Sequence, residues 1–297
     1  MTSYIISGES TTDFTFEKFK EIDVEYIGCH FYLDGKEYYD DLGQSLPHEK
    51  FYKILESGAK SSTAAIAIGD YAEYFRSFLS KGKDLIHLTL TSGLSSTIEA
   101  AKLAAEQVQI EYPNRKIYIV DSMCCSPGFG MLLEEMSRMR LAGKSIEQVF
   151  DWVEQNKLRM HHEFLTTDLT YFIRGGRVSP VAGFIGNVLG ICPIMTMDSK
   201  GHLIPYEKAR SVKKGLNRII QHMQDLADNG IEYADEVMVC HSNCPDIADL
   251  FVEKINQHFK NVTCNIESYC IGPTVGSHTG TGTVAVFFWG KERTAQD

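Results

Sequence analysis

Five hydroxyl side chains stand together where the segment 84–108 changes from strand-like to helix-like sequence. They are Thr91, Ser92, Ser95, Ser96 and Thr97, and they surround Gly93. Alternating apolar residues before them predict a strand, and apolar residues at helical spacing after them predict a helix. The first turn of a helix carries unpaired N–H groups and a partial positive charge, so this start suits an anion such as phosphate or carboxylate. Ordinary N-capping is the alternative interpretation, but it needs only one hydroxyl, and the surplus favours a ligand site.

Two more hydroxyl-rich stretches lie elsewhere in the chain. One consists of Ser61, Ser62 and Thr63. The other is a predicted loop over 271–283, which has glycines at 272, 276, 280 and 282 and places His278 beside Thr279. A loop histidine is usually solvated and without a role, but imidazole among hydroxyls can also contact a ligand. Both interpretations of this histidine stay open.

The usual nucleotide and metal motifs are incomplete. Gly143-Lys144-Ser145 resembles the end of a P-loop, but Arg138 occupies the required upstream glycine position. A possible dinucleotide fingerprint at 128–133 has leucine where its third glycine should stand. Cys240 and Cys244 lack a second ligand pair at zinc-finger spacing, so we expect no metal site.

Two other classes of function remain open. Ser95 and His278 could meet as the dyad of an acyl hydrolase, although the chain has no G-x-S-x-G elbow. A serine beside a histidine is equally suited to holding a carboxylate. The hydroxyl-rich helix start would also fit a phosphosugar- or nucleotide-binding α/β protein.

Composition excludes several broad classes. The 297 residues carry a formal net charge of −10, which argues against nucleic-acid binding because phosphate neutralisation needs a basic face. No apolar run is long enough for an integral membrane segment, and the N-terminus lacks the pattern of a signal peptide. We therefore expect a cytoplasmic protein whose eight cysteines are reduced thiols.

The order of predicted elements indicates two domains, 1–161 and 162–297. In the first, strands near 4–7, 24–33, 37–39, 84–90 and 116–120 alternate with helices near 16–22, 47–57, 68–80, 98–108, 128–142 and 145–160. This alternation predicts an α/β domain with a mostly parallel sheet. In the second, strands near 164–167, 191–197, 202–209, 236–240, 262–268 and 284–289 accompany a loop at 171–179 and helices near 181–189, 212–228 and 246–258. Its adjacent hairpin strands predict an α+β domain with antiparallel pairing.

Five motifs in register resemble those of the DegV family of fatty-acid-binding proteins. They are Ser92-Gly93-Leu94-Ser95-Ser96-Thr97, Asp121-Ser122, Arg174-Gly175-Gly176-Arg177-Val178-Ser179, Lys208-Ala209-Arg210 and His278-Thr279-Gly280-Thr281-Gly282. The resemblance covers essentially the whole chain. It implies two α/β domains that enclose a long-chain fatty acid. It also implies a non-enzymatic carrier, without a cofactor, that presents the carboxylate to a separate ATP-dependent fatty acid kinase for acyl phosphate formation.

The same resemblance implies roles for particular residues. The carboxylate contacts would fall on Ser95, on the Ser61-Ser62 cluster and on His278. Thr63, Ser92, Arg177 and Thr279 would lie near the head group, and Arg210 would meet the kinase. Where the family usually has Thr-Ser-Gln-Pro, this chain has Ser61-Ser62-Thr63-Ala64, so the contacting hydroxyl stays open among the first three. The usual Asp-Ser after the first strand is Gly8-Glu9-Ser10 here.

Two further groups complete the sequence-based hypothesis. Candidate walls for the acyl tail are Phe184, Ile185, Val188, Leu189 and Ile194, although ordinary core packing is the alternative for each. A basic patch in an otherwise acidic chain could dock the kinase, and a solvated face is its alternative. This patch consists of Arg174, Arg177, Lys208, Arg210, Lys213 and Lys214.

Overall fold

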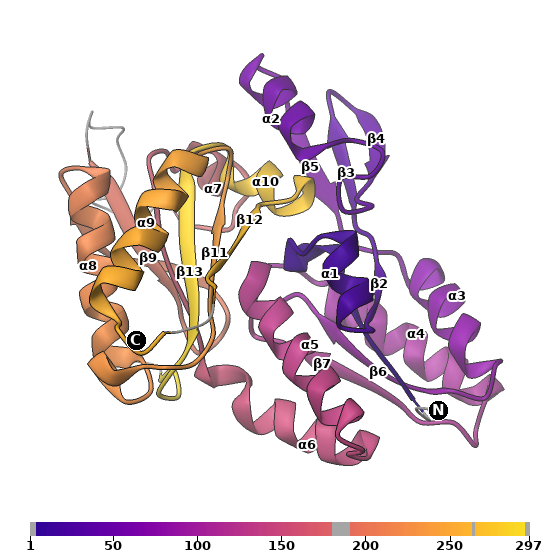
Figure 1. Ribbon diagram of the computed structural model, residues 1–297. Helices are drawn as coiled ribbons and strands as arrows, with labels where there is room; N and C mark the ends of the chain where they lie inside the picture. Colours follow the sequence, from indigo (N-terminus) through magenta and orange to yellow (C-terminus); the bar gives the residue numbers. More distant parts are fainter. Residues whose placement is uncertain (1–3, 180–190, 263–264, 295–297) are drawn as a thin grey trace.

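The computed structural model describes residues 4–179, 191–262 and 265–294. Within these ranges the chain forms a four-stranded sheet and a small three-stranded sheet in the N-terminal half, and a six-stranded sheet in the C-terminal half (Figure 1). The α/β class, with a parallel first sheet and a largely antiparallel second one, is as the sequence predicted.

The first sheet is entirely parallel. Its strands are β1 (Tyr4–Glu9), β2 (Glu25–Ile27), β6 (Asp84–Thr89) and β7 (Ile117–Asp121), in the order β2-β1-β6-β7. Apolar side chains on one face pack against α3 (Ile68–Leu79) and α4 (Thr97–Glu111), and those on the other face pack against α5 (Ser126–Leu141) and α6 (Ile146–Asn156). Because both faces are covered, the polar residues collect at the carboxyl ends of the strands, where Glu9 closes β1.

A small antiparallel sheet stands apart from the first one. It contains β3 (His30–Leu33), β4 (Lys36–Tyr39) and β5 (Ser61–Ala64), in the order β4-β3-β5, next to α2 (His48–Glu56). The predicted hairpin turn is confirmed, since Asp34 and Gly35 both have positive φ, at 50° and 81°. The single strand expected over 24–33 is divided, because the chain leaves the parallel sheet at Gly28 and enters the small sheet at His30.

The third sheet occupies the C-terminal half. Its strands are β8 (Met160–Thr166), β9 (Cys192–Met197), β10 (Leu203–Ala209), β11 (Val237–His241), β12 (Glu267–Cys270) and β13 (Thr283–Trp289), in the order β10-β9-β8-β13-β11-β12. All neighbours are antiparallel except β11 and β12. One face packs against α8 (Val212–Leu226) and α9 (Pro245–His258), and the other contacts α5 from the N-terminal half.

Two predicted loops contain short helices. The chain forms α7 over Thr170–Arg174, and the Asp168 carboxylate accepts both the backbone N–H and the hydroxyl of Thr170, the first residue of this helix. Within 271–283 it forms α10 (Pro273–Thr279), which begins at a proline and ends before Gly280 at a φ of 64°. His278 therefore lies in the last turn of a helix, not in a loop.

Other expectations are corrected or lie outside the described residues. The strand expected over 262–268 is wrong for residues 262, 265 and 266, because β12 begins at Glu267, and residues 263–264 lie outside the described part of the chain. Ile194, expected as a wall for the acyl tail, packs instead in the core on the α8 and α9 side of the third sheet. The helix expected over 181–189, with Phe184, Ile185, Val188 and Leu189, lies outside the described residues. β8 begins next to the domain boundary expected near residue 161, which stays a prediction.

The remaining short elements connect these layers. They are α1 (Phe16–Glu21) and three 3-10 turns at Ser10–Thr12, Lys157–Arg159 and Gly230–Glu232. No helix in the described part of the chain is both long enough and apolar enough to cross a membrane.

Candidate functional site

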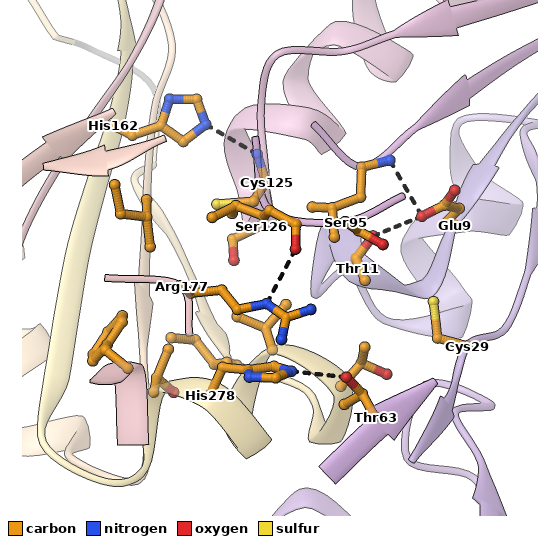
Figure 2. Close-up of a pocket in the computed structure, with 18 of the residues that line it drawn as sticks. Glu9, Thr11, Cys29, Thr63, Ser95, Cys125, Ser126, His162, Arg177 and His278 are labelled. Atoms are coloured by element: carbon orange, nitrogen blue, oxygen red, sulfur yellow. Dashed lines mark hydrogen bonds between the residues drawn. The ribbon is translucent and has the colours of Figure 1, made fainter. Parts of the chain in front are cut away.

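A cavity of about 220 Å³ lies between the first and third sheets, and both halves of the chain line it (Figure 2). Its floor on the third sheet is made by side chains of three neighbouring strands, Phe164 of β8, Ala285 and Phe287 of β13, and Cys240 of β11. Further apolar lining comes from Leu90, Leu94, Phe172, Leu203, Ile271 and Val275. An apolar wall of this kind suits a hydrocarbon chain, and polar side chains of both halves supply the rest of the lining.

His278 makes one of the polar contacts that join the two halves at this cavity. The Nε2 atom of His278 on α10 lies 2.8 Å from Oγ1 of Thr63 on β5 (Figure 2). Burial, together with the nearby positive charges of Arg177 and Arg174, lowers the pKa of His278 to about 4. The imidazole is therefore neutral at pH 7. When it accepts the hydroxyl proton of Thr63 at Nε2, it carries its own proton on Nδ1, which has no partner among the described residues.

The position of α10 depends on two glycines. A β-carbon on Gly175, just after α7, would lie 2.3 Å from His278 Nδ1. A β-carbon on Gly280, just after α10, would lie 2.4 Å from the ring of Tyr171, and its positive φ independently favours glycine. Glycine at these positions lets α7 and α10 approach closely enough for the histidine to reach the cavity.

Two buried carboxylates hold the start of α10 against the N-terminal half. Asp13 accepts the backbone N–H of Gly272 at 2.9 Å, and Asp40 accepts both the N–H and the hydroxyl of Thr274. Burial raises the pKa of Asp13 to about 8 and that of Asp40 to about 6, because little solvent reaches either charge. These contacts tie the element that carries His278 to the other half of the chain.

Arg177 brings a positive charge to the cavity. Its Nε donates to the carbonyl of Leu94 at 3.1 Å, and its Nη1 donates to the carbonyl of Gly175 at 2.6 Å. Burial lowers the pKa of this guanidinium, and no carboxylate of the described residues forms an ion pair with it. An arginine held by carbonyls alone retains its charge for an anionic ligand.

The hydroxyl-rich start of α4 contributes some of its residues to the cavity. Ser95 lies in the lining, and its Oγ accepts the backbone N–H of Thr97, so it also provides the local cap. Ser96 and Thr97 line the cavity too. Ser92 does not, because it is exposed and its backbone N–H is held by the Asp121 carboxylate.

The second hydroxyl cluster is separated by the alternation of β5. Thr63 faces the cavity and Ser62 is exposed. Ser61 lies outside the lining and donates to the carbonyl of Ser277 at 3.2 Å. Among the three hydroxyls that the sequence left open, the structure places only Thr63 in the lining. Thr279 also lines the cavity, and its place near a head group stays a prediction.

Glu9 is a residue of the lining that sequence reasoning missed. It is fully buried at the carboxyl end of β1, and Tyr71 Oη donates to its Oε1 at 2.5 Å, while the Leu90 N–H donates to its Oε2 at 3.2 Å. Two hydroxyls, those of Thr11 and Thr97, lie 3.4 Å away. A useful signal was present, since an acidic residue closing a buried parallel strand lies where α/β proteins bind ligands.

The hydrogen bonds around the predicted dyad differ from those of a hydrolase. His278 is bonded to Thr63, and Ser95 accepts a backbone N–H, so no described contact joins this serine to this histidine. In the described part of the chain, no three His, Cys, Asp or Glu side chains lie close enough together to hold one metal ion. Arg210 is exposed just beyond β10, and Lys213 and Lys214 are exposed at the start of α8.

Comparison with known proteins agrees with the sequence motifs. A family model described as "Uncharacterised protein, DegV family" matches residues 5–291. A DegV domain-containing protein of Clostridium perfringens is 32% identical over 293 residues, which cover 99% of each chain.

Solved structures share the fold. A DegV lipid-binding protein from Thermotoga maritima superposes with a TM-score of 0.85 at 24% identity, covering 98% of this chain and 100% of the other. A DegV family protein from Eubacterium eligens loaded with heptadecanoic acid gives a TM-score of 0.84 at 24% identity, covering 97% and 100%. A stearic-acid-binding protein from Eubacterium ventriosum gives 0.85 at 22%, covering 96% and 97%.

Proposed function

Since the chain belongs to the DegV family, we propose that it binds a long-chain fatty acid in the cavity between its first and third sheets. The observation that carries this proposal is the pairing of an apolar wall with an uncompensated Arg177 and a neutral His278 in one cavity. The ligands named for the Eubacterium proteins, heptadecanoic acid and stearic acid, have the same two chemical parts.

The carboxylate would bind at the polar end of the cavity. Arg177 supplies charge, His278 and Thr63 supply hydrogen-bonding groups, and Ser95 supplies a hydroxyl beside the first turn of α4. Charge-assisted hydrogen bonds to a carboxylate are about twice as strong as neutral ones, so Arg177 would contribute most to recognition of the charge. The neutral imidazole holds the Thr63 hydroxyl without adding a second buried charge.

The acyl tail would supply most of the affinity. Burial of about fourteen methylenes at about 0.8 kcal/mol each amounts to about 11 kcal/mol before the cost of ordering the ligand is subtracted. Aromatic and aliphatic side chains of the third sheet, Phe164 and Phe287 among them, would pack along it. Discrimination between tail lengths then follows from the depth of the cavity.

The bound lipid would be a carried ligand and not the substrate of this chain. No described contact joins Ser95 to His278, the pair that a hydrolase would use, and the chain lacks a complete phosphate-binding motif. We propose that a separate ATP-dependent fatty acid kinase phosphorylates the presented carboxylate to an acyl phosphate, and that no cofactor resides on this chain. The exposed Arg210, with Lys213 and Lys214, would dock this partner.

Mass spectrometry of the small molecules released from freshly purified protein tests the lipid assignment. We expect one fatty acid per chain. A protein that is empty and also fails to take up added fatty acid would refute it, and phosphorylated ligands would then be tested at the α4 start.

The docking surface has a separate test. Arg210→Ala should weaken coupling to the kinase and leave the dissociation constant for fatty acid unchanged, because this side chain lies outside the cavity lining. Equal loss of both would refute the docking role.

A further inference from the structure

The fully buried carboxyl of Glu9 lies in the wall of a cavity that we propose receives another carboxylate. Its side chain has no exposed surface, and it is part of the lining. Figure 2 shows it on the N-terminal side of the cavity, together with Thr11 and Ser95. Thr97 lies between Glu9 and the expected head-group position at Ser95, because its Oγ1 is 3.4 Å from Glu9 and its backbone N–H donates to Ser95 Oγ.

No positive charge compensates this carboxyl. The described residues form no ion pair with Glu9, and its partners are the hydroxyls of Tyr71, Thr11 and Thr97 and the backbone N–H of Leu90. The other titratable groups around it are Tyr71 of α3 and the buried thiol of Cys29. Arg177 and His278 belong to the same lining but make their hydrogen bonds elsewhere.

An anionic ligand in the cavity would further destabilise the ionised form of Glu9. Two carboxylates in one desolvated cavity repel each other strongly, and the usual outcome is that one of them takes up a proton. The ligand is held by Arg177 and by donors, whereas Glu9 has only neutral partners, so Glu9 is the group that should be protonated.

We propose that Glu9 takes up a proton when a fatty acid carboxylate enters the cavity, so that lipid binding is coupled to the protonation of this side chain. This inference rests on the proposed function. It makes Glu9 a specificity residue that favours carboxylate ligands at lower pH and leaves binding of uncharged lipids independent of pH. Protonated Glu9 can donate to a hydroxyl such as that of Thr97, so its proton needs no new partner.

The direction and the pH window follow from the environment of Glu9. Burial raises its pKa to about 7 in the unliganded protein, and a bound anion raises it further. Affinity for fatty acid should therefore fall as pH rises above 7, by up to about 30-fold between pH 6 and pH 8.5, if one proton is linked. A carboxylic acid of ordinary pKa is ionised throughout this range, so the ligand itself does not contribute.

Titration calorimetry in two buffers of different ionisation enthalpy measures the linked protons directly. We would titrate lipid-free protein with tetradecanoate at pH 7.5, below its micellar concentration, and use tetradecanol as the uncharged ligand. We expect uptake of more than half a proton per tetradecanoate bound, and none for tetradecanol. Glu9→Gln should abolish the uptake, whereas Glu163→Gln should keep it. Glu163 is an equally buried carboxyl on β8 that bonds Tyr206 outside this lining.

A second variant retains the carboxyl in case Glu9→Gln does not fold. Tyr71→Phe removes the 2.5 Å hydrogen bond that stabilises ionised Glu9. The pKa of Glu9 should therefore rise, and the fall in fatty acid affinity should occur at higher pH. Unchanged proton uptake in Glu9→Gln, or binding of tetradecanoate without proton uptake in the wild-type protein, would overturn the inference while leaving the proposed function in place. Failure to bind either ligand at any pH would instead refute the proposed function.

Discussion

Ala285 offers a direct test of where the acyl tail lies. This residue is at the centre of the cavity floor, because its neighbours across β13 are Cys240 on β11 and Phe164 on β8, and all three line the cavity. Ala285→Leu would add three carbon atoms to this floor. Since the added carbons enter open space, we expect the unliganded protein to unfold at the same temperature as the wild type, or slightly above it.

The cost to the ligand can be worked out from the displaced length. The three added carbons exclude two to three methylenes of a long tail from the cavity. Burial of each methylene contributes about 0.8 kcal/mol to binding, so the loss is about 2 kcal/mol, or about 30-fold in the dissociation constant. Displacement of a fluorescent fatty acid would be measured with octadecanoate and with tetradecanoate. We expect the dissociation constant of octadecanoate to rise by this factor and that of tetradecanoate to change much less.

A matched variant on the same strand separates cavity filling from general damage. Val286 is next in β13, but its side chain is fully buried in the other core, against α8 and α9. Val286→Ile should lower the free energy of unfolding by overpacking, and it should leave both dissociation constants unchanged. If Ala285→Leu bound octadecanoate as tightly as the wild type, or weakened both acids equally, the tail would not cross this floor.

Three further perturbations test the polar end and the contact between the halves. Thr63→Val removes the hydroxyl bonded to His278 and should weaken fatty acid binding by about 1 kcal/mol, whereas Ser62→Ala, on the exposed face of the same strand, should change nothing in the same displacement assay. Arg177→Met should weaken binding of the fatty acid far more than binding of the matching alcohol. Equal weakening of both would argue against a contact between Arg177 and the carboxylate. Because the pKa of Asp13 is about 8 in the folded chain and near 3.9 when unfolded, the folded state binds more protons, and stability should fall as pH rises from 4 to 8. Urea denaturation at pH 5 and pH 8 would show a smaller pH effect in Asp13→Asn, and an unchanged effect would exclude this residue as the source.

The sequence by itself determined the elements and the residue types of the site. Helical and strand periodicities are local properties, so nearly all the long elements were predicted close to their observed bounds, and the Asp34-Gly35 turn followed from the need for positive φ. The hydroxyl clusters indicated an anion site from their local sequence alone, whereas the roles of His278 and Arg177 at the head group were expected from the family resemblance. Thr63, Ser95, Arg177, His278 and Thr279 do lie together in one lining.

Tertiary structure decided what those residues can do. Because alternate side chains of β5 point to opposite faces, Thr63 lines the cavity and Ser62 is exposed. The Asp121 carboxylate holds the backbone of Ser92, whose exposed side chain lies outside the cavity. The chemistry of Glu9 was invisible in sequence, because its pKa depends on burial and on partners from α3 and the loop after β6, more than sixty residues away. Pattern in a chain reports which groups are present, whereas desolvation and hydrogen bonding between distant segments set their charge and direction, and only the folded chain supplies these.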